Sequence, residues 1–181
     1  MANFCNILDK YVVLKLPLNR YRGTNHTLES DFQIAGSEVR KKIRNDEKRL
    51  LKLYYYYLQA PYHGNLKGWR NESPIYILHQ GSLVSGIYLC DQNEFNECGN
   101  WGQLHYFFTE PAFKRKGLHS VLVKHAIERA KSWNLEGLII NTDRCLLPDV
   151  YVRWGAISWK EIKKVNSSSR ISSLKKLFRN R

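Results

Sequence analysis

Few residues in this sequence could form disulfide, redox or metal sites. Its four cysteines are Cys5, Cys90, Cys98 and Cys145. They form no CxxC pair and have no zinc-finger spacing, so the sequence predicts neither a thiol redox centre nor a structural zinc site. Four histidines also lack metal-ligand spacing: His26, His63, His79 and His125. We therefore expect no metal.

Long apolar runs are also missing. No segment approaches the roughly 20 apolar residues of a membrane-spanning helix. Asp9 and Lys10 interrupt the first apolar residues, so no signal peptide is expected. Together with the missing CxxC spacing, this predicts a cytoplasmic protein with reduced thiols.

Acidic residues are scarce. The 181 residues contain 16 Asp and Glu against 29 Lys and Arg, a net charge of +13. Residues 160–181 alone carry eight Lys or Arg and one acid. We interpret residues 1–165 as a single domain, since 43% hydrophobic residues suffice for a core, and residues 166–181 as a flexible basic tail. Such a tail is expected to bind polyanions weakly.

Apolar periodicity and chain breakers predict alternating strands and helices. Six strands are expected, over residues 11–16, 75–79, 83–90, 103–109, 138–141 and 156–163. Three helices are expected, over residues 37–58 (capped by Ser37), 117–133 and 148–154 (ended by Gly155). Residues 80–82 join two strands as a hairpin, and residues 103–141 form a right-handed parallel crossover. The fold class is therefore α/β (α+β), a mixed central sheet with helices on both faces.

The most informative segment is the basic turn over residues 113–120. An apolar strand leads into it, and a helical pattern starting at Gly117 leads out. Amides at a helix start are unpaired and the helix dipole is positive there, while Lys114, Arg115 and Lys116 add charge. The turn is therefore expected to bind phosphate.

Three motifs resemble the GNAT superfamily of acetyl-CoA-dependent N-acetyltransferases. Residues 114–119 (KRKGLH) are similar to the family's Arg/Gln-x-x-Gly-x-Gly/Ala turn, and residues 109–111 (TEP) to its Val-x-Pro lead-in. Residues 151–156 (YVRWGA) are similar to its Tyr-x-x-x-Gly-Phe motif. The chain departs from the pattern at His119, where the family has a small residue, at Ala156, where the family has an aromatic one, and more mildly at Lys114. Arg144 stands where the family commonly has an asparagine, and Asn141 lies near enough to replace it.

The resemblance implies a GNAT-like acyl-CoA acyltransferase fold with acetyl-CoA as co-substrate. The family binds CoA where two parallel strands splay apart, here residues 103–109 and 138–141. Backbone amides of the first strand would pair with pantetheine, at Phe107, Phe108 and Thr109. The turn would take the pyrophosphate through Lys114, Arg115, Lys116, Gly117, Leu118, His119 and Ser120, with Asn141 opposite.

Transfer to an amine needs an acid for the departing thiolate and a base for the amine. By the resemblance, Tyr151 is the acid, because a phenol can protonate a thiolate. Gln103 occupies the position of a glutamate base in histone acetyltransferases but cannot take a proton. Strand alternation places Gln103, His105 and Phe107 on one face, so His105 is the expected base, directly or through a water. Glu110 is a weaker candidate.

The acceptor is expected to be a small-molecule amine, an amino sugar or a nucleotide-linked one among them. Residues 54–70 contain no acid and several aromatic side chains, which suit sugar rings better than a polyamine. The expected acceptor-binding residues are Tyr57, Trp69, Trp101 and Gln103.

Other interpretations stay open on the sequence alone. The basic tail and first helix also suit a nucleic-acid-associated protein, for example one that acetylates aminoacyl-tRNA, although no known nucleic-acid-binding motif is present. A non-catalytic acyl-CoA-binding module is a further possibility, as is a homodimer. The tail also has a short amphipathic pattern that could lie on a membrane surface.

Overall fold

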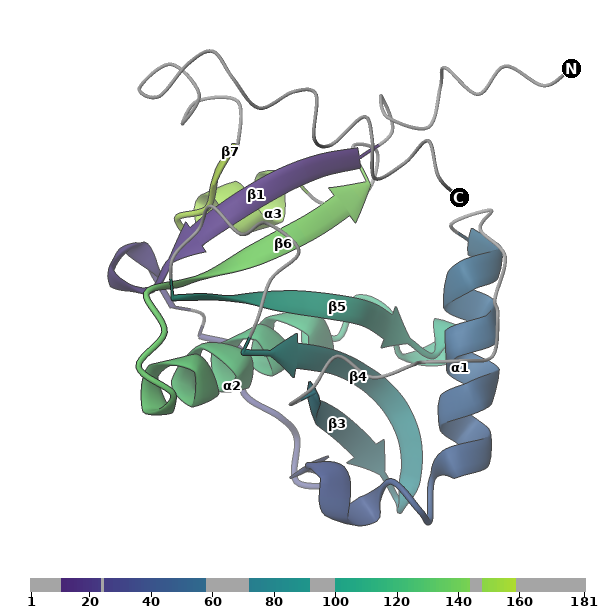
Figure 1. Cartoon of the computed structure of the whole chain (residues 1–181). Coiled ribbons are helices and arrows are strands. Elements are labelled where there is room, and N and C mark those ends of the chain that lie inside the picture. The colour runs from purple at the N-terminus through teal and green to yellow at the C-terminus, as the bar shows by residue number, and fades with distance from the viewer. Residues whose placement is uncertain (1–10, 24, 58–71, 92–99, 144–147, 159–181) are drawn as a thin grey trace, which may run out of the picture.

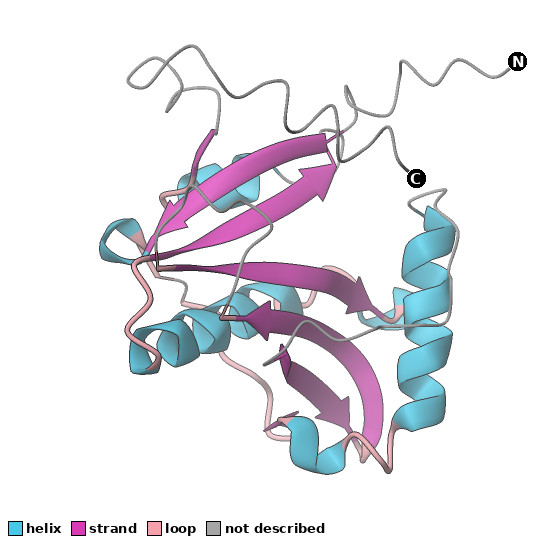
Figure 2. Ribbon diagram, viewed as in Figure 1, coloured by secondary structure: helices cyan, strands magenta, loops and turns pink. Residues whose placement is uncertain are grey.

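The computed structural model describes residues 11–23, 25–57, 72–91, 100–143 and 148–158. Within them, seven strands form one mixed sheet in the order β2-β3-β4-β5-β6-β1-β7 (Figures 1 and 2). The strands are β1 (Tyr11–Pro17), β2 (Phe32–Ala35), β3 (Glu72–His79), β4 (Ser82–Cys90), β5 (Trp101–Thr109), β6 (Gly137–Asp143) and β7 (Ile157–Ser158). The helices are α1 (Arg44–Tyr57), α2 (Leu118–Ser132) and α3 (Pro148–Arg153), with short 3-10 helices η2 (Leu18–Arg20), η3 (Ser37–Val39) and η4 (Pro111–Phe113).

The predicted order of strands and helices is confirmed, with three differences. β2 was not predicted. The first helix begins at Arg44, not Ser37, because residues 37–39 form η3 and the Gly36 amide bonds Glu38 Oε1 at 2.6 Å. Of the predicted last strand, the described part contains β7, and the remainder lies outside the described residues.

The hairpin between β3 and β4 has the predicted tight turn. His79 pairs with Ser82, so Gln80 and Gly81 alone form the loop. Their φ angles are 50° and 80°. Two successive left-handed residues match the right-handed twist of the adjoining strands, and Gly81 adopts this conformation without steric cost.

β5 and β6 are the parallel pair, and they separate along their length. Pairing runs from Trp101–Gly137 to Leu104–Ile140. Both strands continue beyond that point, to Thr109 and Asp143, without further pairing to each other. Figure 1 shows the two strands diverging towards their carboxyl ends. The predicted splayed pair is confirmed.

The N-terminal strand completes the other side of the sheet. β1 pairs antiparallel with β6 over its full length, from Tyr11–Asp143 to Pro17–Gly137, and also with β7. It therefore lies between two strands that follow it by more than a hundred residues. Leu14 and Leu16 on β1 are buried, so this insertion forms part of the core.

Helices cover both faces of the sheet, as predicted. α2 packs on β3, β4, β5 and β6, and α1 packs on β4 and β5. The apolar positions of α2 recur at helical spacing and are buried: Leu118, Val121, Leu122, Val123, Ala126, Ile127 and Ala130. Among the described helices, none is long and apolar enough to cross a membrane.

A buried carboxylate holds α1 against the sheet. Glu47 is 4% exposed and accepts hydrogen bonds from the phenols of Tyr76 on β3 and Tyr88 on β4. Arg40 Nε lies 3.3 Å from Glu47 Oε1 and supplies the opposite charge. Because a buried charge is costly unless it is paired and hydrogen-bonded, these four side chains fix the position of α1.

Candidate functional site

A bulge in β5 determines which side chains face α1 and which face α2. Tyr88 pairs with His105 and Gly86 with Phe108, so Tyr106 and Phe107 together stand opposite one residue of β4. Tyr106 has φ 53°, a conformation rare for a bulky residue. The extra residue shifts the alternation of side chains along the strand.

This shift overturns one sequence prediction. Phe107 packs with the α2-side core, and Tyr106 and Phe108 belong to the α1-side cluster. His105 contacts Tyr106, with ring centroids 5.6 Å apart. The prediction that Phe107 shares a face with His105 and Gln103 is therefore wrong, because strict alternation does not hold across a bulge.

The short helix η4 joins β5 to the basic turn. After η4, Arg115 and Gly117 adopt left-handed φ angles of 66° and 73°, and α2 begins at Leu118. The Gly117 carbonyl accepts the amides of Ser120 at 3.0 Å and Val121 at 3.3 Å. Among the described residues, the amides from Arg115 to His119 donate no backbone hydrogen bond. The turn therefore presents a run of open donors at the positive end of a helix.

A loop residue far away in the sequence lies against this turn. A Cβ added to Gly117 would lie 2.7 Å from Nδ1 of His26. The His26 side chain is exposed and comes from the segment before β2. Gly117 is thus required both by its φ angle and by the neighbouring imidazole.

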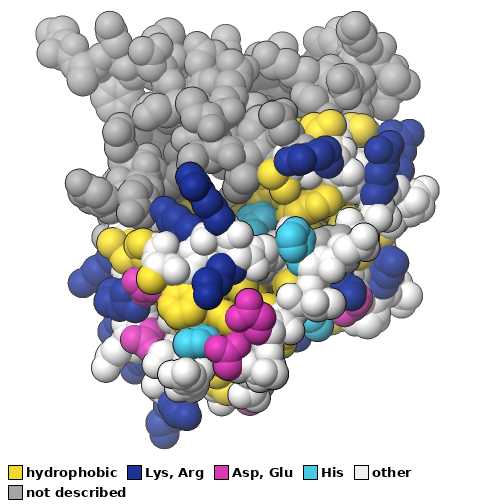
Figure 3. All heavy atoms as spheres, turned by 180° about the vertical axis from the view of Figure 1, so that it is seen from behind, with side chains coloured by type: hydrophobic (Ala, Val, Ile, Leu, Met, Phe, Trp, Pro, Cys, Tyr) yellow, Lys and Arg dark blue, Asp and Glu magenta, His cyan; other side chains and the backbone are white. Residues whose placement is uncertain are grey.

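The three cations of the turn have different surroundings. Lys114, Arg115 and Lys116 are exposed. Lys116 Nζ lies 5.5 Å from the ring centroid of Phe113 and 5.8 Å from that of Phe32, a cation–π arrangement. On the face turned away from the viewer in Figure 1, Lys and Arg side chains lie among hydrophobic and His side chains (Figure 3).

Beside the splayed end of β5, four rings form an aromatic cluster, defined by Phe107, His119, Tyr151 and Trp154. The Tyr151 phenol lies 2.8 Å from His119 Nε2, and Tyr151 is 1% exposed. The His119 ring is 4.5 Å from Phe107 and 5.8 Å from Trp154, centroid to centroid. The His119 side chain, expected at the phosphate, thus has its ring directed into this cluster.

Burial shifts the pKa values of the candidate proton-transfer groups. Loss of hydration lowers the pKa of His119 to about 4 and that of His105 to about 4, so both imidazoles are neutral at pH 7. Burial also raises the pKa of Tyr151 well above 10, so its phenol is protonated.

Of the four predicted acceptor residues, two have described side chains, Trp101 and Gln103, and both belong to β5. Trp101 lies at the paired end of β5, away from the turn, where its Nε1 donates to Glu136 Oε2 at 3.2 Å. Gln103 is fully buried. Trp69 lies outside the described residues. The side chains of Tyr57 in α1 and of Asn141 in β6, a predicted cofactor residue, also lie outside them.

The end of β5 is fixed by side-chain hydrogen bonds. Ser85 Oγ donates to the Phe108 carbonyl at 2.9 Å and lies 2.8 Å from Thr109 Oγ1. Glu110, the weaker base candidate, forms an ion pair with Arg49 at 2.5 Å. Its carboxylate thus links the strand end to α1.

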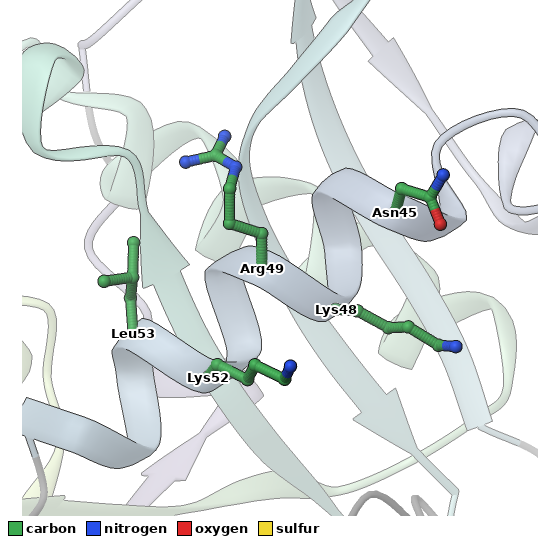
Figure 4. A pocket seen from close by; sticks show the side chains of 5 residues that line it. All are labelled: Asn45, Lys48, Arg49, Lys52 and Leu53. Atoms are coloured by element: carbon green, nitrogen blue, oxygen red, sulfur yellow. The ribbon is translucent and has the colours of Figure 1, made fainter.

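A surface pocket lies along α1. Figure 4 shows the residues that line it, Asn45, Lys48, Arg49, Lys52 and Leu53. Three of the five are cations, so the pocket favours an anionic occupant. Among the described residues, no group of three His, Cys, Asp or Glu side chains could hold a metal ion.

A family profile decides the classification. The profile described as "Acetyltransferase (GNAT) family" matches residues 41–149, more than half of the chain. The chain belongs to the GNAT family. The match covers α1 to the start of α3 and so includes the splayed strands and the basic turn of this GNAT chain. A search of curated proteins finds no match.

Solved structures share the GNAT fold at low sequence identity. A GCN5-related N-acetyltransferase from Kribbella flavida is 10% identical with a TM-score of 0.57, covering 82% of this chain and 54% of that one. A glucosamine N-acetyltransferase region of a fungal multi-domain beta-N-acetylglucosaminidase is 16% identical with a TM-score of 0.60, covering 83% and 20%. A ribosomal-protein-alanine N-acetyltransferase from Brucella melitensis is 20% identical with a TM-score of 0.52, covering 78% and 95%. The chain thus spans about half of the length of the Kribbella flavida protein and about a fifth of the fungal one.

Two features of the site were missed from sequence. The approach of His26 to Gly117 joins residues 91 positions apart, and no local pattern indicates it. The Tyr151–His119 hydrogen bond joins two residues that were each named, but for separate roles. The only sequence feature that pointed to this hydrogen bond was a histidine at position 119, where the family has a small residue.

Proposed function

We propose that this GNAT chain transfers an acetyl group from acetyl-CoA to the primary amine of a small molecule. One observation carries the proposal. β5–β6 pairing stops at Leu104–Ile140, and β5 then runs, with its edge no longer paired to β6, almost to the basic turn. A strand edge followed by open amides and cations suits an extended thioester arm that ends in a diphosphate.

The turn itself fits an anionic group. Gly117 has no side chain to obstruct its amide, and the neighbouring amides up to His119 donate no backbone bond among the described residues. The exposed Arg115 can reach a phosphate that binds there. Charge-assisted hydrogen bonds of this kind are about twice as strong as neutral ones.

Proton transfer is assigned to two residues. Acetyl-CoA supplies an activated acyl group as a thioester. The Tyr151 phenol gives its proton to the departing sulfur, a step typically worth about 10²–10⁴ in rate. His105, which burial keeps uncharged, accepts the amine proton directly or through a water. Tyr151→Phe tests the acid and His105→Ala tests the base. An unchanged pH–rate profile in His105→Ala would exclude His105 as the base.

For the acceptor we propose an amino sugar. Residues 54–70 contain no acid to bind a polyamine, and their aromatic side chains suit a sugar ring. The fungal protein named above is a glucosamine N-acetyltransferase region. We extend its acceptor class to this chain as part of the proposal.

The decisive experiment measures acetyl-CoA binding and turnover in the full chain. Acetyl-CoA should raise the melting temperature, because a ligand that binds only the folded state stabilises it. Thiol release should then be screened over amino sugars, amino acids and polyamines. Binding without turnover of any amine would favour a non-catalytic acyl-CoA module, and absence of binding would refute the proposal.

Charge variants locate the phosphate site. Arg115→Ala should raise KM for acetyl-CoA about tenfold or more, the usual effect of losing a hydrogen bond to a charged group. Lys116→Ala should have a smaller effect, because its ammonium lies over Phe32 and Phe113. Lys124→Ala, an exposed lysine further along α2, is the matched control and should leave KM unchanged.

A second candidate is an amine carried on RNA. Six exposed cations lie in the α1 pocket, at the start of α1 and just before it: Lys41, Lys42, Arg44, Lys48, Arg49 and Lys52. If RNA binds there, the association constant should fall steeply with salt. A plot of its logarithm against the logarithm of the salt concentration should have a slope of about −0.7 to −0.9 per phosphate contacted. The double variant Lys48→Gln/Lys52→Gln removes two such contacts and should make this slope less steep by almost two. A slope that does not change would exclude this surface.

A further inference from the structure

His119 is a residue at which this chain departs from the family motif, and its ring lies beside the proposed acid. It comes from the second residue of α2, and Tyr151 comes from α3. The two side chains share a hydrogen bond of 2.8 Å between Nε2 and the phenol oxygen. A small residue at position 119 could not make this contact.

The cluster holds the imidazole in one orientation. Trp154 stacks on it at an interplanar angle of 19°, and Phe107 lies on it at 30°. The rings leave Tyr151 as the polar partner of Nε2. The ring centroids of Phe107 and Tyr151 are 5.9 Å apart. Phe107 lies on β5, three residues after the last residue that pairs with β6. His119 and Tyr151 therefore lie next to the splayed end of β5.

We propose that His119 is a positioning residue for Tyr151: its Nε2–H donates to the phenol oxygen and so leaves the phenol hydrogen free for the departing sulfur. This inference rests on the function proposed above. The other tautomer, with the proton on Nδ1, would instead take the phenol hydrogen for Nε2 and withhold it from the sulfur.

The C–S bond breaks and its electron pair stays on sulfur, which takes the hydrogen of the Tyr151 phenol. The negative charge left on the phenol oxygen is stabilised by the Nε2–H of His119. The amine nitrogen has by then formed the C–N bond and lost its proton to His105. A proton returned through solvent restores the phenol, so no further reactant is needed.

The surroundings make such a donor useful. Burial raises the pKa of Tyr151, so an unassisted phenol would be a poor acid here. A hydrogen bond to the charged form counteracts this effect. Within the described residues, His119 faces Tyr151 and the rings of Phe107 and Trp154, and Tyr54 also acts on Tyr151.

The tautomer can be observed without any activity. In the full chain with ¹⁵N-labelled histidine, the His119 signals are assigned by their absence from His119→Phe or His119→Gln. The proposal expects a protonated Nε2 and an unprotonated Nδ1 at pH 7. A protonated Nδ1 with an unprotonated Nε2 would overturn it, whether or not an acceptor amine is found.

Kinetics supply a second test. His119→Phe keeps a ring in the cluster but loses the donor, so kcat with acetyl-CoA should fall about 10- to 100-fold at unchanged KM. His119→Gln, which retains an N–H donor, should recover most of this loss. With the acetyl thioester of 4-nitrothiophenol, whose thiolate leaves without an acid, the loss should nearly vanish.

A merely structural role predicts something else. His119→Phe would then lose equally with both thioesters, and that result would refute the proposal. His125→Phe on the same helix, where His125 pairs with Glu128 at 3.5 Å, is the control and should match the wild type. If the wild type acetylates no amine, the proposed function fails, and the tautomer measurement alone decides the positioning claim. If His119→Phe does not fold, the tautomer measurement and the kinetics of His119→Gln decide the positioning claim.

Discussion

Gly117 and His26 are in direct contact, although Gly117 immediately precedes α2 and His26 lies before β2. A Cβ at Gly117 would lie 2.7 Å from His26 Nδ1, closer than real Cβ contacts. The loop before β2 therefore packs on the turn that we assign to the diphosphate. This contact makes the glycine a test of the whole site.

Gly117→Ala should destabilise the protein and weaken acetyl-CoA binding. The left-handed φ of 73° costs a residue with a Cβ about 1–2 kcal/mol, and the His26 ring must also move. Gly23→Ala is the matched control, because Gly23 has φ 79° with no atom within 4 Å of its added Cβ. Urea unfolding should show the larger loss for Gly117→Ala. Equal losses would mean that the His26 contact contributes nothing.

Tyr151→Phe should lower kcat about 10²–10⁴-fold with little change in acetyl-CoA affinity, because it removes the proton donor but keeps the ring. Losing the bond to His119 should also cost about 1 kcal/mol of stability. Tyr21→Phe serves as control, because the Tyr21 hydroxyl is buried with no hydrogen-bond partner in the described part of the chain. Unchanged thiol release in Tyr151→Phe would exclude the acid role.

Glu47→Gln should be strongly destabilising. The carboxylate accepts bonds from two phenols and pairs with Arg40, and an amide cannot compensate that cation. Losing a charged hydrogen-bond partner typically costs a buried group about 1–3 kcal/mol, and two phenols are affected. Arg40 adds less, because its side chain is 38% exposed. Glu128→Gln, an exposed partner of His125, should cost at most about 1 kcal/mol. A free energy of unfolding that is equal for both variants would contradict the anchoring role of Glu47.

Stability should fall as the pH falls from 6.5 towards 4. Burial lowers the pKa of His105 and His119 to about 4 from an ordinary 6.5, so in this window the unfolded chain binds protons that the folded chain does not. Each group gives a slope of at most about 1.4 kcal/mol per pH unit, with its full contribution present above pH 6.5. The pH dependence of stability is measured from urea unfolding midpoints between pH 7 and pH 5. His119→Phe should reduce the slope, and an unchanged slope would show that His119 is not buried as a neutral group.

Much of the fold could be predicted because its signals are local. The buried stripe of α2 repeats at helical spacing, and the Gln80–Gly81 turn is specified by its own residues. The basic turn is also specified by its own residues. The splayed pair joins distant strands, and it was expected only from the family resemblance carried by three short motifs.

The site was less predictable because its key contacts are not local. The bulge at Tyr106 depends on how β5 pairs with β4, and it placed Phe107 on the face opposite His105. β2 was missed because it is a short strand that pairs only with β3 within the described sheet. His26 reaches Gly117 only because the loop before β2 crosses the turn.

By itself, the sequence determined the order of strands and helices, the excess of positive charge, and a glycine turn able to hold an anion. The tertiary structure alone decided that β1 lies between β6 and β7, and that the His119 ring meets the Tyr151 phenol. The physical reason is that periodicity and turn chemistry act over a few residues. Strand neighbours and the direction of a buried side chain depend instead on packing between segments that are distant in the chain.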